Sequence, residues 1–254
     1  MGAAWPCRMS IGSGLALAAA SFLAAEQTID HTAWDQFLQR SVKDGLVDYR
    51  RLQKEEEALA GYLASLQDVD LAQLSSREAQ LAFWINAYNA CVVKGVLDHS
   101  PLTSVKAVKG FFDNIRYRIG GESLTLNEIE AKGRALGDWR IHFAVVCASS
   151  SCPSLRSEAY VPDRLEAQLT EQTSQFLRHP STGLRLDATQ RVLWVSNIFR
   201  WYAKDFVPSG ALTVGNLLEV IGPYVEPSVV QAIGRQRLKL KFLEYDWTLN
   251  AQSS

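Results

Sequence analysis

The sequence lacks an excess of charge of either sign. Its 254 residues include 26 Lys and Arg against 27 Asp and Glu, which gives a formal net charge of −1. Basic residues form no cluster anywhere along the chain. Nucleic acids and anionic membrane surfaces bind basic patches. We therefore expect no nucleic-acid partner.

Long apolar runs are also missing, except near the N-terminus. Residues 14–25 read GLALAAASFLAA, and Arg8 is the one charge before them. The run is too short to span a bilayer and ends in small residues, which is typical of a cleavable secretory signal peptide. We predict such a signal peptide over residues 1–25 and an exported protein, periplasmic or secreted. An uncleaved anchor is the alternative, and after cleavage we expect no integral membrane segment.

Cysteine is scarce, and common catalytic and metal-binding spacings are absent. Of four cysteines, Cys7 falls in the predicted signal peptide, which leaves Cys91, Cys147 and Cys152. No CxxC or HxxxH spacing occurs, and the serines at 149–151 form no GxSxG motif. These absences argue against a zinc site and a serine hydrolase. We expect no metal and no cofactor, whereas an oxidising compartment would permit one disulfide.

Composition and patterning predict a single α+β domain over residues 26–254. Hydrophobic residues make up 47% and charged residues 21%, without internal repeats. Amphipathic patterns predict helices over residues 34–42, 55–66, 126–136, 162–178, 198–206, 214–221 and 228–235. Hairpins are predicted around Gly120-Gly121 and over residues 184–195, with a final strand at 238–245. Residues 140–147, RIHFAVVC, predict a buried central strand in a mostly antiparallel sheet.

The longest predicted helix covers residues 76–97. A capping box, SSRE at residues 75–78, precedes it, with Ser75 as the expected cap. Residues 81–93 read LAFWINAYNACVV, with apolar side chains on every face. We therefore expect a central helix that is buried all round.

Asn86 and Asn89 are the polar exceptions on this helix. They are three residues apart and share one face, and both must find hydrogen-bond partners if they are buried. Either the two amides hold neighbouring loops, or one of them orients His142 or binds a substrate oxyanion. Cys91, on the same helix, is expected to be a core residue.

The candidate site lies in the loop that follows the predicted strand. Cys147 ends the strand, and Cys152 follows in CASSSCP. Small residues such as Ser149 and Ser151 allow a substrate to approach the backbone. Three interpretations remain open for the cysteines: a structural disulfide, a reactive thiol or redox pair with a lowered pKa, or inert buried thiols.

His142 is the nearest candidate base. On a regular strand it would lie about 16 Å from Cys147 and on the opposite face. Cys152 can fold back over the strand, so we predict Cys152 as the nucleophile and His142 as its base, with Cys147 as the second thiol. The alternative is a buried histidine bonded to a backbone carbonyl or a carboxylate.

Five blocks of the sequence resemble a known family. They are FWINAYNA (83–90), RIHFAVVCASSSCPSL (140–155), EAY (158–160), IFRWYAKDF (198–206) and YDWTLN (245–250). Together they resemble the domain-of-unknown-function family 547 over roughly residues 46–250. Glu158, in the third block, joins the expected binding residues.

The resemblance implies little about a reaction. Bacterial members of this family are commonly exported, and some relatives join the domain to a glutaredoxin, which favours thiol chemistry. The family pattern matches at Asn86, Asn89, His142, Cys147, Cys152 and Pro153. A central helix before a strand that carries His is similar, at the level of the fold alone, to papain-like and transglutaminase-like proteins. The prediction is a thiol-dependent enzyme acting by acyl transfer or disulfide exchange on a peptide or small molecule. A non-catalytic envelope binding protein is the alternative.

Overall fold

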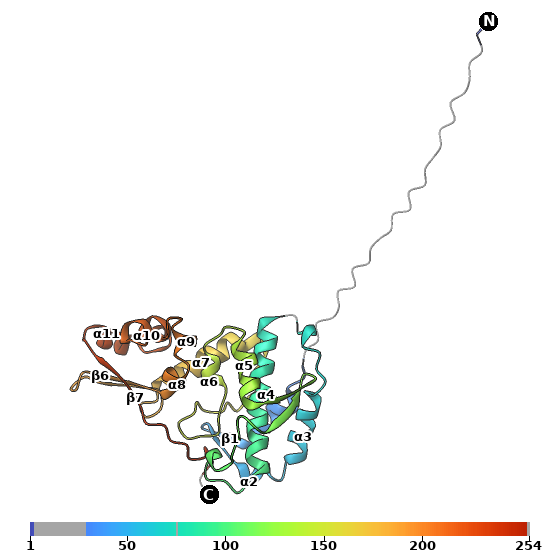
Figure 1. Ribbon diagram of the computed structural model, residues 1–254, viewed down its shortest axis with the longest axis horizontal. Coiled ribbons are helices and arrows are strands. Elements are labelled where there is room, and N and C mark those ends of the chain that lie inside the picture. The colour runs from blue at the N-terminus through green and yellow to red at the C-terminus, as the bar shows by residue number, and fades with distance from the viewer. Residues whose placement is uncertain (3–28, 75, 253–254) are drawn as a thin grey trace.

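The computed structural model describes residues 1–2, 29–74 and 76–252 (Figure 1). The predicted signal peptide, residues 1–25, lies outside these ranges apart from its first two residues. Within the described ranges, no helix has the length and apolar character needed to cross a membrane.

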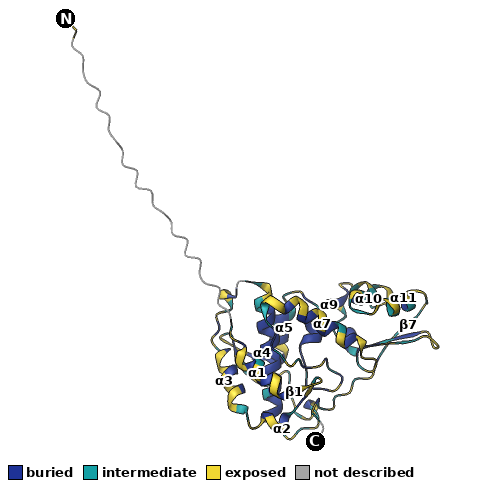
Figure 2. Cartoon of the chain, turned by 180° about the vertical axis from the view of Figure 1, so that it is seen from behind, coloured by how far each residue is buried: buried dark blue, intermediate teal, exposed yellow. Residues whose placement is uncertain are grey.

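Helix α4 (Arg77–Asp98) is the centre of the N-terminal half, as predicted. It is buried along most of its length and on all sides (Figure 2). Ser76 caps it by accepting a hydrogen bond of 3.1 Å from the backbone N–H of Ala79. The expected cap, Ser75, lies outside the described residues.

Short elements surround α4. They are α1 (Thr32–Ser41), β1 (Val42–Lys43), β2 (Leu46–Val47), α2 (Tyr49–Leu52), α3 (Glu56–Ser65), η1 (Leu71–Gln73), η2 (Val105–Ala107), β3 (Arg116–Ile119), β4 (Glu122–Thr125) and α5 (Leu126–Arg134). A capping box at Thr125 starts α5, because the Thr125 hydroxyl and the Glu128 carboxylate each bond the other residue's backbone N–H. Helices α3 and α5 both pack on α4.

The C-terminal half contains η3 (Pro162–Arg164), α7 (Leu165–Arg178), β5 (Leu184–Asp187), β6 (Val192–Val195), α8 (Asn197–Trp201), α9 (Ala203–Phe206), α10 (Val214–Ile221), η4 (Gly222–Tyr224), α11 (Pro227–Gly234) and β7 (Lys239–Phe242). The longest helix of this half is α7, which contacts η3, β5 and η4. The predicted helix at 198–206 is interrupted at Tyr202. Figure 1 shows β6, β7, α10 and α11 on the side of the molecule away from α3.

The predicted α+β class is confirmed, with strands distributed over several small sheets. In the described residues β1 pairs with β2, β3 with β4, and β5 with β6, all antiparallel. Strand β7 returns beside β6 in the parallel direction. The expected single sheet is therefore three small ones, and most of the pairings are antiparallel.

The predicted central strand at 140–147 is wrong. Residues Ile141–Ala144 form a short helix, α6, and Val145, which follows it, is extended. Asn89 takes the place of a partner strand, because its amide bonds the carbonyl of Ala144 and the N–H of Val146. A short apolar run cannot distinguish a buried helical turn from a strand, and here the tertiary contacts decide.

Helix α6 joins two hydrophobic clusters. Ile141 and Ala144 belong to the cluster around α4. Phe143 belongs to the second cluster, where its ring stacks on Phe176 with centroids 4.9 Å apart. Neighbouring residues of one helical turn therefore point into different clusters, which holds His142 at the junction between them.

Candidate functional site

One cavity brings the predicted catalytic residues together. Its volume is about 680 Å³, and its lining includes His142, Cys147 and Cys152. On a strand the first two would lie on opposite faces, but the helical turn of α6 shortens the path between them. The strand geometry behind their expected separation therefore does not apply, although the two side chains make no hydrogen bond to each other. All three predicted catalytic side chains border the same space.

The two sulfurs lie beside each other. Cys147 and Cys152 are free thiols with Sγ atoms 2.8 Å apart, and the backbone N–H of Cys147 donates to Cys152 Sγ at 2.8 Å. The chain turns between them through Ala148, whose φ of 60° lies in the left-handed region that favours glycine. The N–H of Cys152 bonds the carbonyl of Ser149 at 3.0 Å and closes the turn. Cys152 folds back as predicted, but onto Cys147 and not onto His142.

Three hydrogen-bonding groups surround the Cys147 sulfur. Besides Cys152, the hydroxyls of Ser149 and Tyr245 lie 3.1 and 3.2 Å from it. Burial alone would raise the pKa of Cys147, but these groups stabilise the thiolate and lower the pKa to about 7. For Cys152, burial and the adjacent Cys147 both raise the pKa well above its usual value. Near neutral pH Cys147 is therefore partly ionised, whereas Cys152 remains a thiol.

The C-terminal segment holds this loop in place. The N–H of Ser150 donates to the carbonyl of Thr248 at 2.7 Å, and Ser151 exchanges bonds with the backbone of Asp246. The hydroxyls of Ser149 and Tyr245 also lie 3.1 Å from each other, so both stand beside the Cys147 sulfur. Ser149 and Ser151, predicted to bind substrate, thus shape the loop. Tyr245 was missed, because only this pairing of distant segments places its hydroxyl on the sulfur.

Removing the Tyr245 hydroxyl tests its role. We expect Tyr245→Phe to raise the pKa of Cys147 by roughly one to two pH units, since a hydrogen bond to a charged group contributes about 1.5–3 kcal/mol. The pH dependence of iodoacetamide alkylation, followed by mass spectrometry, measures this. Tyr224→Phe, away from the cavity lining, is the control. An unchanged alkylation profile in Tyr245→Phe would contradict the assignment.

His142 is a buried histidine bonded to a carboxylate. Its Nε2 lies 2.8 Å from Asp205 Oδ2, and its ring stacks on Tyr202 with centroids 4.0 Å apart. Burial lowers the pKa of His142 to about 4, although Asp205 acts in the opposite direction. The imidazole is thus neutral at pH 7. Nδ1 is buried without a partner among the described residues, and Nε2 is taken by Asp205, so neither sulfur bonds the ring.

Asn86 and Asn89 each hold a loop, which was one of the two alternatives. Asn86 bonds the carbonyl and the N–H of Tyr160 at 2.7 and 3.0 Å. Asn89 bonds Ala144 and Val146 at 3.0 and 2.9 Å. Both side chains are buried and use donor and acceptor together. Asn89 thereby fixes the backbone immediately before Cys147. Cys91 is buried in the core, as predicted.

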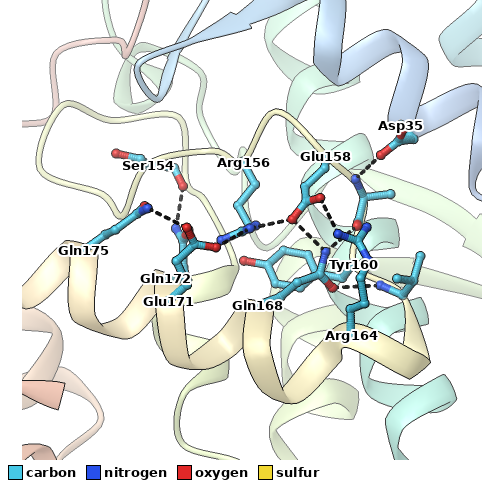
Figure 3. Close-up of polar contacts among 12 residues, drawn as sticks. Asp35, Ser154, Arg156, Glu158, Tyr160, Arg164, Gln168, Glu171, Gln172 and Gln175 are labelled. Carbon is cyan, nitrogen blue, oxygen red and sulfur yellow. Dashed lines mark hydrogen bonds and ion pairs between the residues drawn. The ribbon is translucent and has the colours of Figure 1, made fainter.

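Glu158 belongs to a polar cluster beside α7. Its carboxylate accepts hydrogen bonds from Arg156, from Arg164 at 2.9 Å and from Gln168 at 3.0 Å (Figure 3). Burial opposes ionisation, but these three donors lower the pKa of Glu158 to about 2. The residue lies outside the cavity lining and orders the loop before α7.

This cluster predicts an acid dependence of stability. The pKa of Glu158 is about 2 in the fold against an ordinary 4.5, so its contribution is present above pH 4.5 and is lost as the pH falls towards 2. Glu158→Gln is expected to remove about 1–2 kcal/mol at pH 6 and less at pH 3. Urea unfolding at both pH values measures this. An equal loss at both values would contradict the ionic origin.

Metal ligands do not gather in the described part of the chain. No three His, Cys, Asp or Glu side chains there come close enough together to hold a metal ion.

Comparison with known proteins identifies the family. Residues 71–177 match the family described as protein of unknown function, DUF547, and this part of the chain belongs to that family. The match spans α4 to α7 and includes Cys147 and Cys152, which confirms the predicted family. The blocks at 198–206 and 245–250 lie beyond the matched residues. No curated protein and no solved structure matches the chain.

Proposed function

We propose that this protein catalyses thiol–disulfide exchange, with Cys147 as the attacking thiolate and Cys152 as the resolving thiol. The observation that carries the proposal is the pair of free sulfurs 2.8 Å apart at a cavity. Of these, Cys147 has a pKa lowered to about 7. An attacking thiol works best when its pKa lies near the ambient pH. The roles are thus reversed relative to the sequence prediction, which made Cys152 the nucleophile.

The reaction needs two steps. The Cys147 thiolate attacks one sulfur of a substrate disulfide, forms a mixed disulfide and expels the other substrate sulfur as a thiolate, which takes up a proton. Cys152 then loses its proton to solvent and attacks Cys147 Sγ. This forms the Cys147–Cys152 disulfide and releases the second substrate thiol. Two electrons pass from the protein to the substrate, and a thiol reductant returns the pair to its starting state.

Acyl transfer has less support. A Cys–His mechanism needs the imidazole within hydrogen-bonding reach of the sulfur or of a substrate between them. Here the ring is held by Asp205 and bonds neither sulfur. A pKa of about 4 also makes His142 a weak base at pH 7. His142 is better suited to contact a bound substrate than to activate the thiol.

The redox equilibrium of the pair tests the proposal. The protein is equilibrated with mixtures of reduced and oxidised dithiothreitol, alkylated and analysed by mass spectrometry. We expect reversible conversion between dithiol and disulfide with a potential between about −270 and −120 mV, the range of exchange proteins. A potential below about −300 mV would instead favour a structural disulfide in a binding protein. If no intramolecular disulfide forms, both the exchange reaction and a structural disulfide are excluded.

Export forms part of the same proposal. The apolar run at residues 14–25 supports a cleaved signal peptide, and an oxidising compartment supplies disulfide substrates. N-terminal sequencing of the protein secreted from its own host is expected to start near Glu26. A retained Met1 would contradict cleavage.

A further inference from the structure

Three aromatic side chains, Trp201, Tyr245 and Trp247, pack together in the cavity lining beside the reactive sulfur and form an aromatic wall. Tyr245, whose hydroxyl touches Cys147, lies between Trp201 at 4.7 Å and Trp247 at 4.8 Å, measured between ring centroids. Trp201 is 47% exposed, and among the described residues it shares this exposure with only two other large apolar side chains, Met1 and Leu46. Its exposure extends the wall into solvent. An exposed aromatic ring beside a reactive group is a contact surface for an apolar partner.

Two buried polar atoms in the lining have no partner in the described residues. They are Oε1 of Glu130 and Nδ1 of His142, and both residues are more than nine-tenths buried. They come from different helices, α5 and α6, and both lie next to Tyr202. Buried polar groups are nearly always hydrogen-bonded in folded proteins. These two atoms are therefore free to bond a ligand that enters the cavity.

The two groups differ in what they offer a ligand. Because Nε2 of His142 faces the Asp205 carboxylate, it carries the proton and Nδ1 is an acceptor. Burial raises the pKa of Glu130, although Tyr202 and Arg134 act in the opposite direction, and its carboxyl can accept a hydrogen bond or, when protonated, donate one. A peptide group offers both an N–H donor and a carbonyl acceptor. It therefore complements this pair better than a purely anionic or cationic group does.

We infer that the substrate is a disulfide within a polypeptide, with an aromatic or large aliphatic side chain next to the reacting cysteine stacked on Trp201 and a nearby peptide group bonded to Glu130 and His142. This inference rests on the proposed exchange reaction and names its substrate class. The cavity of about 680 Å³ has room for a few residues of an extended chain. Polypeptides that expose apolar side chains beside a cystine, as unfolded chains do, fit this description.

Two matched peptides test the inference. They are acetyl-Gly-Cys-Phe-Gly-amide and acetyl-Gly-Cys-Ser-Gly-amide, each as its mixed disulfide with 5-thio-2-nitrobenzoate. Attack by Cys147 on the peptide sulfur releases the coloured thiolate, so its appearance gives the second-order rate constant. For the full chain we expect the phenylalanine peptide to react about tenfold faster, because an aromatic pair adds up to about 1.5 kcal/mol.

Three variants test which residues cause the faster reaction of the phenylalanine peptide. Trp201→Ala is expected to bring the ratio of the two rate constants to about one. Trp194→Ala removes a tryptophan outside the cavity lining and should keep the ratio near ten. Glu130→Met should slow both peptides about tenfold without changing their ratio, since it removes a contact to the shared backbone. Circular dichroism checks that each variant is folded.

The outcomes separate the inference from the reaction itself. Equal rates for both peptides in the unmodified protein, or a preference that survives Trp201→Ala, would overturn the polypeptide assignment while exchange stands. No thiolate release from either peptide, nor from 5,5′-dithiobis(2-nitrobenzoate), would overturn the exchange reaction and the inference together.

Discussion

Replacing Cys147 with serine is expected to lower the rate constant for disulfide exchange by on the order of 10³ or more. Serine is almost isosteric, but its hydroxyl does not ionise near neutral pH and cannot attack sulfur. Loss of a nucleophile commonly has an effect of this size. The measurement is thiolate release from 5,5′-dithiobis(2-nitrobenzoate) under pseudo-first-order conditions at pH 7.

Cys152→Ser is the matched control for this prediction. It keeps the attacking thiolate, with Ser149 and Tyr245 still beside it, but removes the resolving thiol. We therefore expect the first step to proceed and the mixed disulfide on Cys147 to persist. Intact-mass spectrometry should show one substrate half bound in Cys152→Ser and none in Cys147→Ser. The opposite pattern would make Cys152 the nucleophile, as the sequence alone predicted.

Asn89→Ala is expected to lower the free energy of unfolding by about 3 kcal/mol. The variant leaves the carbonyl of Ala144 and the N–H of Val146 without their partner, and each such buried group costs about 1–3 kcal/mol. It also frees the backbone that positions Cys147, so the pKa of that thiol should rise. Urea denaturation and the pH profile of alkylation measure the two effects.

Asn86→Ala separates stability from thiol chemistry. This amide makes the equivalent pair of bonds, but to Tyr160 in a different loop. We expect a similar loss of stability, with the pKa of Cys147 unchanged. If both variants alter the thiol equally, the effect comes from general loosening of α4 and the specific role of Asn89 is wrong.

Much of the fold could be predicted because local patterns specify it. The apolar surface of α4, the capping box at Thr125 and the hairpin at Gly120-Gly121 each depend on a few adjacent residues. The buried asparagines were also predictable, since an amide on an all-apolar helix must find partners. The segment at 140–147 was not, because its conformation depends on Asn89 from another element.

By itself, the sequence determined an α+β fold with a central buried helix, and its residues 71–177 match the DUF547 family. It also determined that His142 and the Cys147 to Cys152 loop are the candidate chemical groups. Only the tertiary structure decided which sulfur has the lowered pKa and what His142 binds. Those properties depend on Tyr245 and Asp205, which lie 98 and 63 residues away along the chain. A thiol's pKa is set by the donors and the burial around it, and these exist only after distant segments have packed together.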